Sequence, residues 1–349
     1  MQVGILGWPG SGKSTLFAAL TGRVEDTGRA TEAATAVIHV PDERIDRLSD
    51  MFSPRKTTHA EVVFVDPGAD RSPGADRPTF PEPLLEAVRG VDALALVVRG
   101  FENPGVPRPR GSVSAERDLD SIEQELILRD LERVEKRLER LKKEGNKADN
   151  AAERVLLERL QLQLEAERPL RETAWAPQDL ARMRGFQFLS VKPAVVVCNI
   201  GEEQIGEAPR SLPEQPGRAV LHLCARLECE LAELDADERA QFLEQLGLAE
   251  AARDAFVRTA YRLLELVSFF TVGEDEVRAW PVSRGSTAPV AAGKIHSDLQ
   301  KGFIRAEVIH YDDFIRVGSM AAAKADGVLR LEGKNYHVQD GDIMHVRHA

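Results

Sequence analysis

Short apolar runs alternate with helical periodicity through much of the chain. The runs span residues 3–6, 61–66, 92–98, 194–199 and 219–224. Runs this apolar are typical of strands that are buried on both faces of a sheet. After the first run, Leu16, Phe17 and Leu20 recur at helical spacing. Helices placed between parallel strands predict a doubly wound α/β fold.

A different pattern begins near Ala115 and continues to Glu167, where charged residues are dense. Apolar residues step by three and four along it, at Leu119, Ile122, Leu126, Leu131, Val134, Leu138 and Leu141. This spacing predicts an amphipathic helix with a coiled-coil-like seam. Gly145-Asn146 interrupts it, and a second helical stretch follows with Val155, Leu156, Leu160 and Leu164.

The two stretches predict an antiparallel helical hairpin over residues 115–169, inserted in the α/β domain. Such an arm is either a solvated projection or a docking surface for a large partner. Helical spacing indicates amphipathicity and does not choose between these alternatives. The insertion leaves residues 1–114 and 170–265 for the α/β domain.

The composition shifts again near Leu266. Short strand-like pieces follow: FFTV, VRAWPV, RAEVI, VLRLEG, NYHV and IMHVRH. The segment PVAAGKIHSDLQKGF between them is read as one short helix, and the pair Asp340-Gly341 predicts a hairpin turn. Residues 266–349 are therefore expected to form a compact α+β module with a mostly antiparallel or mixed sheet.

Composition and charge limit the partners and the cellular compartment that we expect for this chain. The net charge of the 349 residues is −11, which argues against non-specific nucleic-acid binding by the whole surface. We also expect no sequence-specific DNA binding. No apolar run approaches the length of a membrane span, and no signal peptide is expected. Three cysteines without metal-ligand spacing favour a reducing cytoplasm.

Residues 7–14, GWPGSGKS, fit the phosphate-loop pattern G-x-x-x-x-G-K-[ST]. Glycines let the backbone curl until its N–H groups point at phosphate oxygens, and a helix N-terminus adds its dipole. We expect Lys13 to reach the β and γ phosphates and to act in catalysis, and the Ser14 hydroxyl to bind Mg²⁺. The predicted nucleotide-binding residues of this loop are Pro9, Gly10, Ser11, Gly12, Lys13, Ser14 and Thr15.

Three further positions follow apolar runs, where a parallel sheet presents groups to a ligand. Asp66 is predicted to hold Mg²⁺ through water, or else to be a turn residue before Pro67-Gly68. Asn199 and Glu202 are predicted to contact a base edge and neighbouring loops. The segment Cys224, Ala225 and Arg226 either bounds the nucleobase or is an ordinary strand-to-helix turn.

Five histidines gather late in the chain. They are His296, His310, His337, His345 and His348. Their spacing matches no known metal-ligand pattern, so we expect scattered surface residues.

At this point the chain resembles the YchF / Obg-like ATPase family of translation-factor-class P-loop NTPases. GWPGSGKSTLFAALTG is similar to the first motif of the family, and NIGE to its altered base-reading motif N-x-x-E. The tail, VRAWPVSRGSTAPVAAGKIHSDLQKGFIRAEVIHYDDFI and then RLEGKNYHVQDGDIMHV, resembles the ubiquitin-like (β-grasp, TGS-type) C-terminal module of the family. The arm lies where the family inserts a coiled-coil hairpin.

The resemblance implies slow hydrolysis of a purine nucleotide, ATP or GTP, with Mg²⁺, and association with a ribosomal RNA or protein surface. It also implies a weakened grip on guanine. Glu202 is one methylene longer than the aspartate of N-K-x-D, and Ile200 replaces the lysine that packs over the base. ATP is therefore the expected preference.

The chain also departs from the family pattern. Gly10-Ser11 replaces Asn-Val in the phosphate loop, and Gly68 is one residue closer to Asp66 than the switch II glycine of D-x-x-G. The threonine of switch I that senses Mg²⁺ falls on Ala30, so Thr31 is the nearest metal candidate. Three hypotheses stay open: a slow NTPase, a nucleotide-binding protein with little turnover, and an RNA- or ribosome-binding module with a vestigial site.

Overall fold

The computed structural model describes residues 1–22, 33–68, 79–106, 112–144, 148–206, 212 and 214–349. The chain forms two compact units, and each combines two separate stretches of sequence. The first contains Met1–Ile38 and Val63–Leu263, and the second contains His39–Val62 and Leu264–Ala349. The sequence pattern assigns residues 39–62 to the nucleotide-binding domain, whereas their contacts group them with the C-terminal module.

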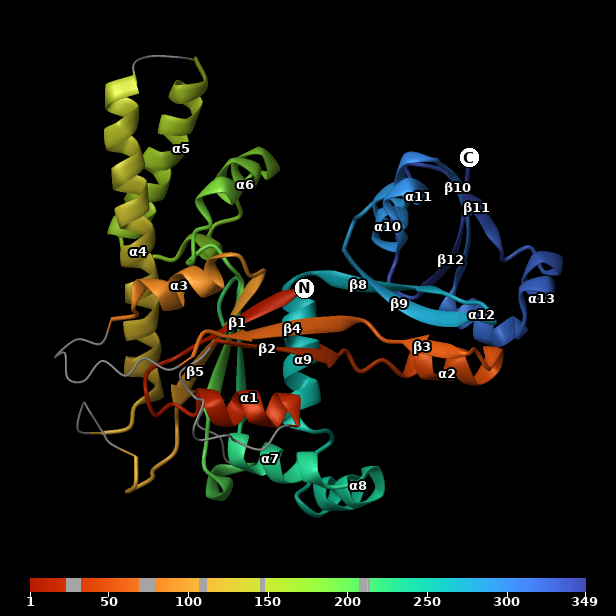
Figure 1. The fold of residues 1–349 in the computed structure, drawn as a ribbon, viewed down its shortest axis with the longest axis horizontal. Helices are drawn as coiled ribbons and strands as arrows, with labels where there is room; N and C mark the ends of the chain where they lie inside the picture. Colours follow the sequence, from red (N-terminus) through yellow and green to blue (C-terminus); the bar gives the residue numbers. More distant parts are fainter. Residues whose placement is uncertain (23–32, 69–78, 107–111, 145–147, 207–211, 213) are drawn as a thin grey trace. The chain divides into compact units, whose positions relative to one another are not determined.

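A six-stranded sheet forms the centre of the first unit (Figure 1). Its order is β2 (Ala34–His39), β4 (Glu61–Asp66), β1 (Gln2–Leu6), β5 (Ala93–Arg99), β6 (Ala194–Asn199) and β7 (Arg218–Leu223). The strands from β4 to β7 are parallel. Their carboxyl ends therefore meet at one edge, where doubly wound sheets bind ligands. The predicted α/β fold is confirmed.

Helices cover both faces of this sheet. Strand register places Phe64 on one face, where it contacts Phe256 of α9 (Ala252–Leu263). Leu96 lies on the opposite face, in a cluster with Leu85 of α3 (Glu82–Arg89) and Leu126 of α4 (Ala115–Glu144). Apart from α5, which is described below with the insert, the other described helices of this unit are α1 (Lys13–Thr21), η1 (Leu170–Glu172), α6 (Pro177–Met183), η2 (Arg184–Phe186), η3 (Glu202–Gln204), α7 (Ala225–Glu233) and α8 (Ala236–Gln245).

Burial differs from strand to strand in this sheet. Every residue of β5 and of β6 is buried, as the apolar runs predict. The same prediction is wrong for the run at 61–66, because β4 alternates and only Val62, Phe64 and Asp66 of this strand are buried. It is also wrong for the run at 219–224, because β7 ends the sheet and only Arg218 and Leu223 of this strand are buried. A strand at the end of a sheet has a neighbour on one side, and fewer side chains pack over it.

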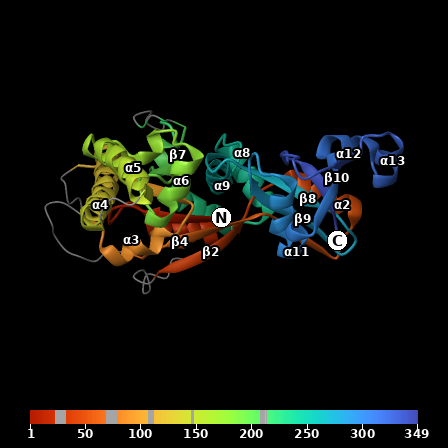
Figure 2. The same cartoon turned by 90° about the horizontal axis from the view of Figure 1, so that it is seen from above.

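Helix α4 and helix α5 (Ala148–Glu165) form the helical insert that the periodicity predicts, and they lie side by side in both views (Figures 1 and 2). Val134 and Leu141 of α4 share a buried cluster with Leu157 and Leu160 of α5. Val155, one of the apolar residues of the second helical stretch, lies outside this cluster and is 57% exposed. The buried stripe instead follows 156, 157, 160 and 164.

The second unit contains a mixed sheet. Its order is β11 (Arg330–Glu332), β10 (Phe303–His310), β12 (Asp342–His348), β8 (Leu266–Thr271), β9 (Glu276–Ser283) and β3 (Lys56–Thr58). β8 and β9 are antiparallel, and β12 joins β8 in parallel at the centre. Helix α10 (Ala288–Ile295) packs its alanines against this sheet. This is the β-grasp arrangement that the resemblance implies.

Three details of the tail differ from the sequence prediction. The single expected helix is two, α10 and α11 (Ser297–Lys301), and NYHV contributes one bridge, Thr287 to His337, instead of a strand. Asp340-Gly341 leads directly into β12, but the described residues immediately before this pair form no strand, so the expected hairpin is not formed there. Helices α12 (Tyr311–Val317) and α13 (Met320–Ala325) were not predicted.

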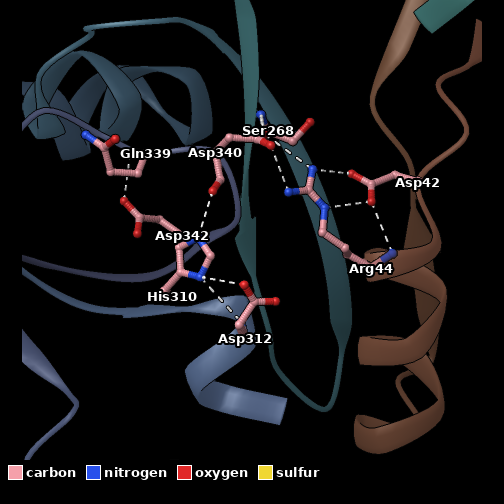
Figure 3. A network of polar contacts seen from close by, with 8 residues as sticks. All are labelled: Asp42, Arg44, Ser268, His310, Asp312, Gln339, Asp340 and Asp342. Carbon is pink, nitrogen blue, oxygen red and sulfur yellow. Dashed lines mark hydrogen bonds and ion pairs between the residues drawn. The ribbon is translucent and has the colours of Figure 1, made fainter. Parts of the chain in front are cut away.

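Residues 39–62 join this second sheet through α2 (Glu43–Phe52) and β3, which pairs in parallel with β9. Arg44 of α2 is held between two carboxylates (Figure 3): its Nε donates to Asp42 at 2.9 Å and its Nη1 to Asp340 at 2.9 Å. Asp340 also accepts from the backbone N–H of Ser268 at 2.9 Å. One aspartate of the tail therefore binds both α2 and β8.

Among the described residues, no helix combines the length and the apolar composition that a membrane span requires.

Candidate functional site

Residues 7–12 connect β1 to α1 and form the candidate phosphate loop. Gly10 and Gly12 have φ of +79° and +92°, a left-handed conformation that favours glycine. A Cβ on Gly12 would lie 2.1 Å from Nδ2 of Asn199, so a side chain there would also displace that amide. Gly12 is the N-cap of α1, and the positive end of this helix is therefore directed at the loop.

Lys13 begins α1 and is only 9% exposed. Its ammonium donates to the carbonyl of Gly7 at 2.7 Å and to that of Trp8 at 3.3 Å. These bonds hold the charge within the curl of the loop. Ser14, the next residue, is exposed and lines the pocket described below. The loop thus combines a fixed cation, a hydroxyl and a helix N-terminus, which suit a phosphate anion.

Asn199 at the end of β6 connects two parts of the site. Its Nδ2 donates to the carbonyl of Ser11 at 3.0 Å, and its Oδ1 accepts from the backbone N–H of Ala225 at 3.0 Å. The side chain is 5% exposed. Asn199 therefore fixes the start of α7 relative to the phosphate loop, and this role in holding neighbouring loops agrees with the sequence interpretation.

A pocket of about 910 Å³ opens at this edge of the sheet. It is lined by the predicted residues Pro9, Gly10, Gly12, Lys13, Ser14, Thr15, Asn199, Ile200, Glu202, Cys224 and Arg226. Ser11 and Ala225 are buried behind the lining, and their backbones hold Asn199. The structure thus brings the phosphate loop and the two segments that are predicted to contact a base around one volume, which is large enough for a drug-sized or nucleotide-sized ligand.

The sequence interpretation missed the loop that follows β5. Phe101, Glu102, Asn103 and Val106 line the pocket. Arg99 holds this loop, because its Nε donates to the carbonyl of Phe101 at 3.0 Å and its guanidinium lies 4.8 Å from the centre of that ring. The signal was present in the sequence, since the loop follows the apolar run 92–98 just as Asn199 follows its own run.

Helix α7 supplies four more lining residues that the sequence interpretation missed: Cys229, Glu230, Ala232 and Glu233. Cys229 Sγ donates to the carbonyl of Thr15 at 3.4 Å. The packing of α7 on α1 brings these four side chains to the site, so the sequence carries no local signal for them. The remaining lining residues are Gly201 and Glu203 beside Glu202, Ala18 in α1, and Gly22 just after α1.

Asp66 ends β4 and is 8% exposed, but it is not among the residues that line the pocket. Burial raises the pKa of Asp66, while the bond from the Gly68 N–H and the charge of Lys13 lower it. That N–H donates to Asp66 Oδ1 at 3.0 Å, and Gly68 has a φ of +88°. The turn alternative considered for Asp66 is therefore present in the structure. The metal candidate Thr31, with Ala30, lies outside the described residues.

No cluster of three or more His, Cys, Asp or Glu with metal-binding geometry occurs within the described residues. The five late histidines accordingly stay without a metal assignment.

The structure defines a P-loop NTPase of the G-domain class with a C-terminal β-grasp module. The defining features are a parallel sheet, a glycine-rich loop at its carboxyl edge, a buried lysine and a helical insert.

Residues 266–349 match the profile of the family YchF-GTPase_C, described as a protein of unknown function (DUF933). The "Ribosome-binding ATPase YchF" of Haemophilus ducreyi is 39% identical, over 99% of this chain and 98% of the relative. The protein of that name from Bacillus subtilis is 36% identical, over 99% of both chains.

A solved structure agrees with these relatives. "Structure of the Schizosaccharomyces pombe YchF GTPase" superposes with a TM-score of 0.87 and 29% identity, and covers 99% of this chain and 97% of that chain. The chain belongs to the YchF family.

Proposed function

We propose that this chain binds a purine nucleoside triphosphate with Mg²⁺ in the pocket beside the phosphate loop and hydrolyses it slowly. The observation that carries the proposal is the position of Lys13, which is buried in the loop at the N-terminus of α1 and lines a pocket that Asn199 also lines. The relatives supply the reaction class, because several are named ATPases and the solved structure is named a GTPase.

The residues present suit Mg²⁺, which prefers hard oxygen ligands and keeps several waters. The exposed hydroxyl of Ser14 would bind the ion directly and the carboxylate of Asp66 through water, and Thr31 is a further candidate. When bound, Mg²⁺ would neutralise charge on the β and γ phosphates. Lys13 would hold the same phosphates from the protein side and stabilise the charge that develops during transfer.

The competing candidate is nucleotide binding with little turnover. It is favoured by the turn at Asp66, where Gly68 is tied to the carboxylate two residues before it. This bond occupies a glycine N–H close to the position where a switch II glycine would contact the γ phosphate. Loss of that contact would slow phosphoryl transfer without weakening the grip of the phosphate loop.

We further propose that the chain associates with ribosomes, on the basis of the relatives named ribosome-binding ATPases that match it over nearly its full length. The helical arm and the C-terminal module are the parts with which such a surface would be contacted.

Lys13→Ala tests the nucleotide proposal. ATP and GTP are titrated with Mg²⁺ into the wild type and into Lys13→Ala, and nucleotide binding and phosphate release are measured on the same sample. Both proteins are then sedimented with ribosomes. Affinity should fall by about tenfold to a hundredfold, because a hydrogen bond to a charged group contributes roughly 1.5–3 kcal/mol. Phosphate release should fall to the background of the buffer.

Lys142→Ala, at an exposed position of the arm outside the pocket, is the matched control for the nucleotide assays and should bind and release as the wild type does. Equal turnover in wild type and Lys13→Ala would reject hydrolysis at this site. Tight binding by the wild type without release above the Lys13→Ala level over hours would establish the competing candidate. If neither protein sediments with ribosomes, the proposed association with ribosomes is rejected.

A further inference from the structure

Charge is distributed unevenly over the pocket. Among the described residues that line it, the carboxylates are Glu102, Glu202, Glu203, Glu230 and Glu233, and the cations are Lys13 and Arg226. Lys13 is committed to the phosphate end, where its ammonium is held by loop carbonyls. Arg226 belongs to the segment that is predicted to bound the nucleobase, and it is the second cation among the described lining residues.

The backbone of Arg226 is well placed. It is the second residue of α7, directly after Ala225, whose N–H donates to Asn199. Asn199 in turn donates to the carbonyl of Ser11 in the phosphate loop. Two hydrogen bonds thus fix the origin of the Arg226 side chain relative to the phosphates of a bound nucleotide.

The guanidinium itself is only loosely held. Its Nε lies 3.5 Å from Glu202 Oε1 and 3.5 Å from Glu230 Oε1, and the side chain is 78% exposed. Exposed ion pairs of this kind contribute little free energy, so a ligand can rearrange them at small cost. Arg226 and Glu202 together offer a base one set of donors and one acceptor.

The two purines differ in what they present at the 6-position: adenine has the N6 amino donor, and guanine has the O6 acceptor. Carboxylates alone suit adenine N6 and repel guanine O6. A guanidinium reverses that repulsion, because arginine donates to O6 and N7 of guanine in the commonest specific contact with that base. We propose that Arg226 is the residue that admits guanine alongside adenine, so that this pocket accepts both GTP and ATP. This inference rests on the proposed function.

The test compares Arg226→Ala with wild type by calorimetric titration of the non-hydrolysable β,γ-imido analogues of ATP and GTP with Mg²⁺. Removal of the donors should weaken the GTP analogue by about tenfold and the ATP analogue by less than about threefold, in keeping with the discrimination of one bidentate base contact. The ratio of the two affinities is the readout, because loss of a positive charge near the triphosphate affects both analogues alike.

Arg154→Ala is the matched control, since Arg154 is paired with Glu158 at 4.0 Å on the arm and should leave both affinities unchanged. A thermal melt of each variant checks folding. An unchanged ratio in Arg226→Ala, with both analogues bound by wild type, overturns the role of Arg226 and leaves nucleotide binding intact. If the wild type binds neither analogue, the proposed function falls and the inference falls with it.

Discussion

At the scale of single residues, Asp130 shows how a buried charge can organise an insertion. This carboxylate of α4 is fully buried and accepts three hydrogen bonds, from the N–H of Leu189 at 2.9 Å and from the N–H and hydroxyl of Ser190 at 2.7 Å each. It therefore ties the arm to the chain just before β6. Burial raises the pKa of Asp130 above its ordinary 3.8, although these three bonds oppose the shift.

Asp130→Asn should lower the free energy of unfolding by about 1–3 kcal/mol near neutral pH, because an amide nitrogen would face a backbone N–H and leave it without an acceptor. The effect should depend on pH. As the pH rises from 3.8 through the raised native pKa, the native state holds a proton that the unfolded state has lost, so the stability contributed by Asp130 declines. The wild-type advantage should therefore be larger at pH 4 than at pH 7, by urea denaturation.

The control is Asp120→Asn, at an exposed position of the same helix, which should change stability little at any pH. A wild-type advantage that grows between pH 4 and pH 7 would contradict the raised pKa.

At the scale of elements, the arm is fastened by ion pairs as well as by leucines. Arg137 of α4 donates to both oxygens of Glu153 on α5, at 2.7 and 2.8 Å, and to Glu144 at 3.0 Å. Hydrogen bonding to Arg137 lowers the pKa of Glu153. The bidentate geometry makes this pair stronger than the usual surface ion pair.

Arg137→Ala should destabilise the pairing of α5 with α4 by about 1 kcal/mol, because both side chains are partly exposed and solvent screens the pair. Hydrogen exchange followed by mass spectrometry should show several-fold faster exchange in α5 and unchanged exchange in β5 and β6. The greater stability of the α4–α5 pairing in the wild type than in Arg137→Ala should disappear as the pH falls through the lowered pKa of Glu153.

Arg140→Ala provides the comparison, because Arg140 lies three residues after Arg137 on the same helix and is exposed. If it accelerates exchange in α5 as much as Arg137→Ala does, the ion pair has no special role.

At the scale of the whole molecule, the second unit depends on a stretch far away in sequence. Arg44 of α2 bonds to Asp340 of the tail (Figure 3). Its guanidinium also lies over the ring of Phe270, 5.2 Å from the ring centre. The charges of Asp42 and Asp340 and their hydrogen bonds raise the pKa of Arg44 against the opposing effect of burial, so the guanidinium stays charged at any accessible pH. The C-terminal module is thus completed by residues 39–62.

Arg44→Ala should destabilise the second unit by about 2 kcal/mol, because it leaves Asp340 with one partner fewer and removes a cation–π contact. Exchange should quicken in β8 and β12, while β1, β5 and β6 of the first unit keep wild-type rates.

Arg55→Ala is the control, because Arg55 pairs with Asp275 where both side chains are more than four-fifths exposed. Uniform acceleration in both units after Arg44→Ala would contradict the division of the chain into two units.

Local signals account for much of what the sequence predicted. The phosphate loop needs its glycines, Lys13 and Ser14 at fixed spacing along one short stretch, so the motif identifies it. The arm is visible because helical packing repeats every three or four residues. Strands β5 and β6 are visible because burial on both faces leaves their residues apolar up to the last position, Arg99 in β5 and Asn199 in β6. Asn199 follows from the rule that ligands meet the carboxyl ends of parallel strands.

Other features depend on partners distant in sequence. Periodicity states which residues are apolar and not which face meets a neighbour, so it does not show that Leu157 is buried while Val155 is exposed. The lining of the pocket by Phe101 and by Glu230 exists because two loops and α7 converge on the phosphate loop. Residues 39–62 carry no mark of the sheet that they extend. The sequence by itself determined the chemistry of each segment, and the tertiary structure decided which segments share a surface, because pairing and packing energies arise only between groups that folding brings together.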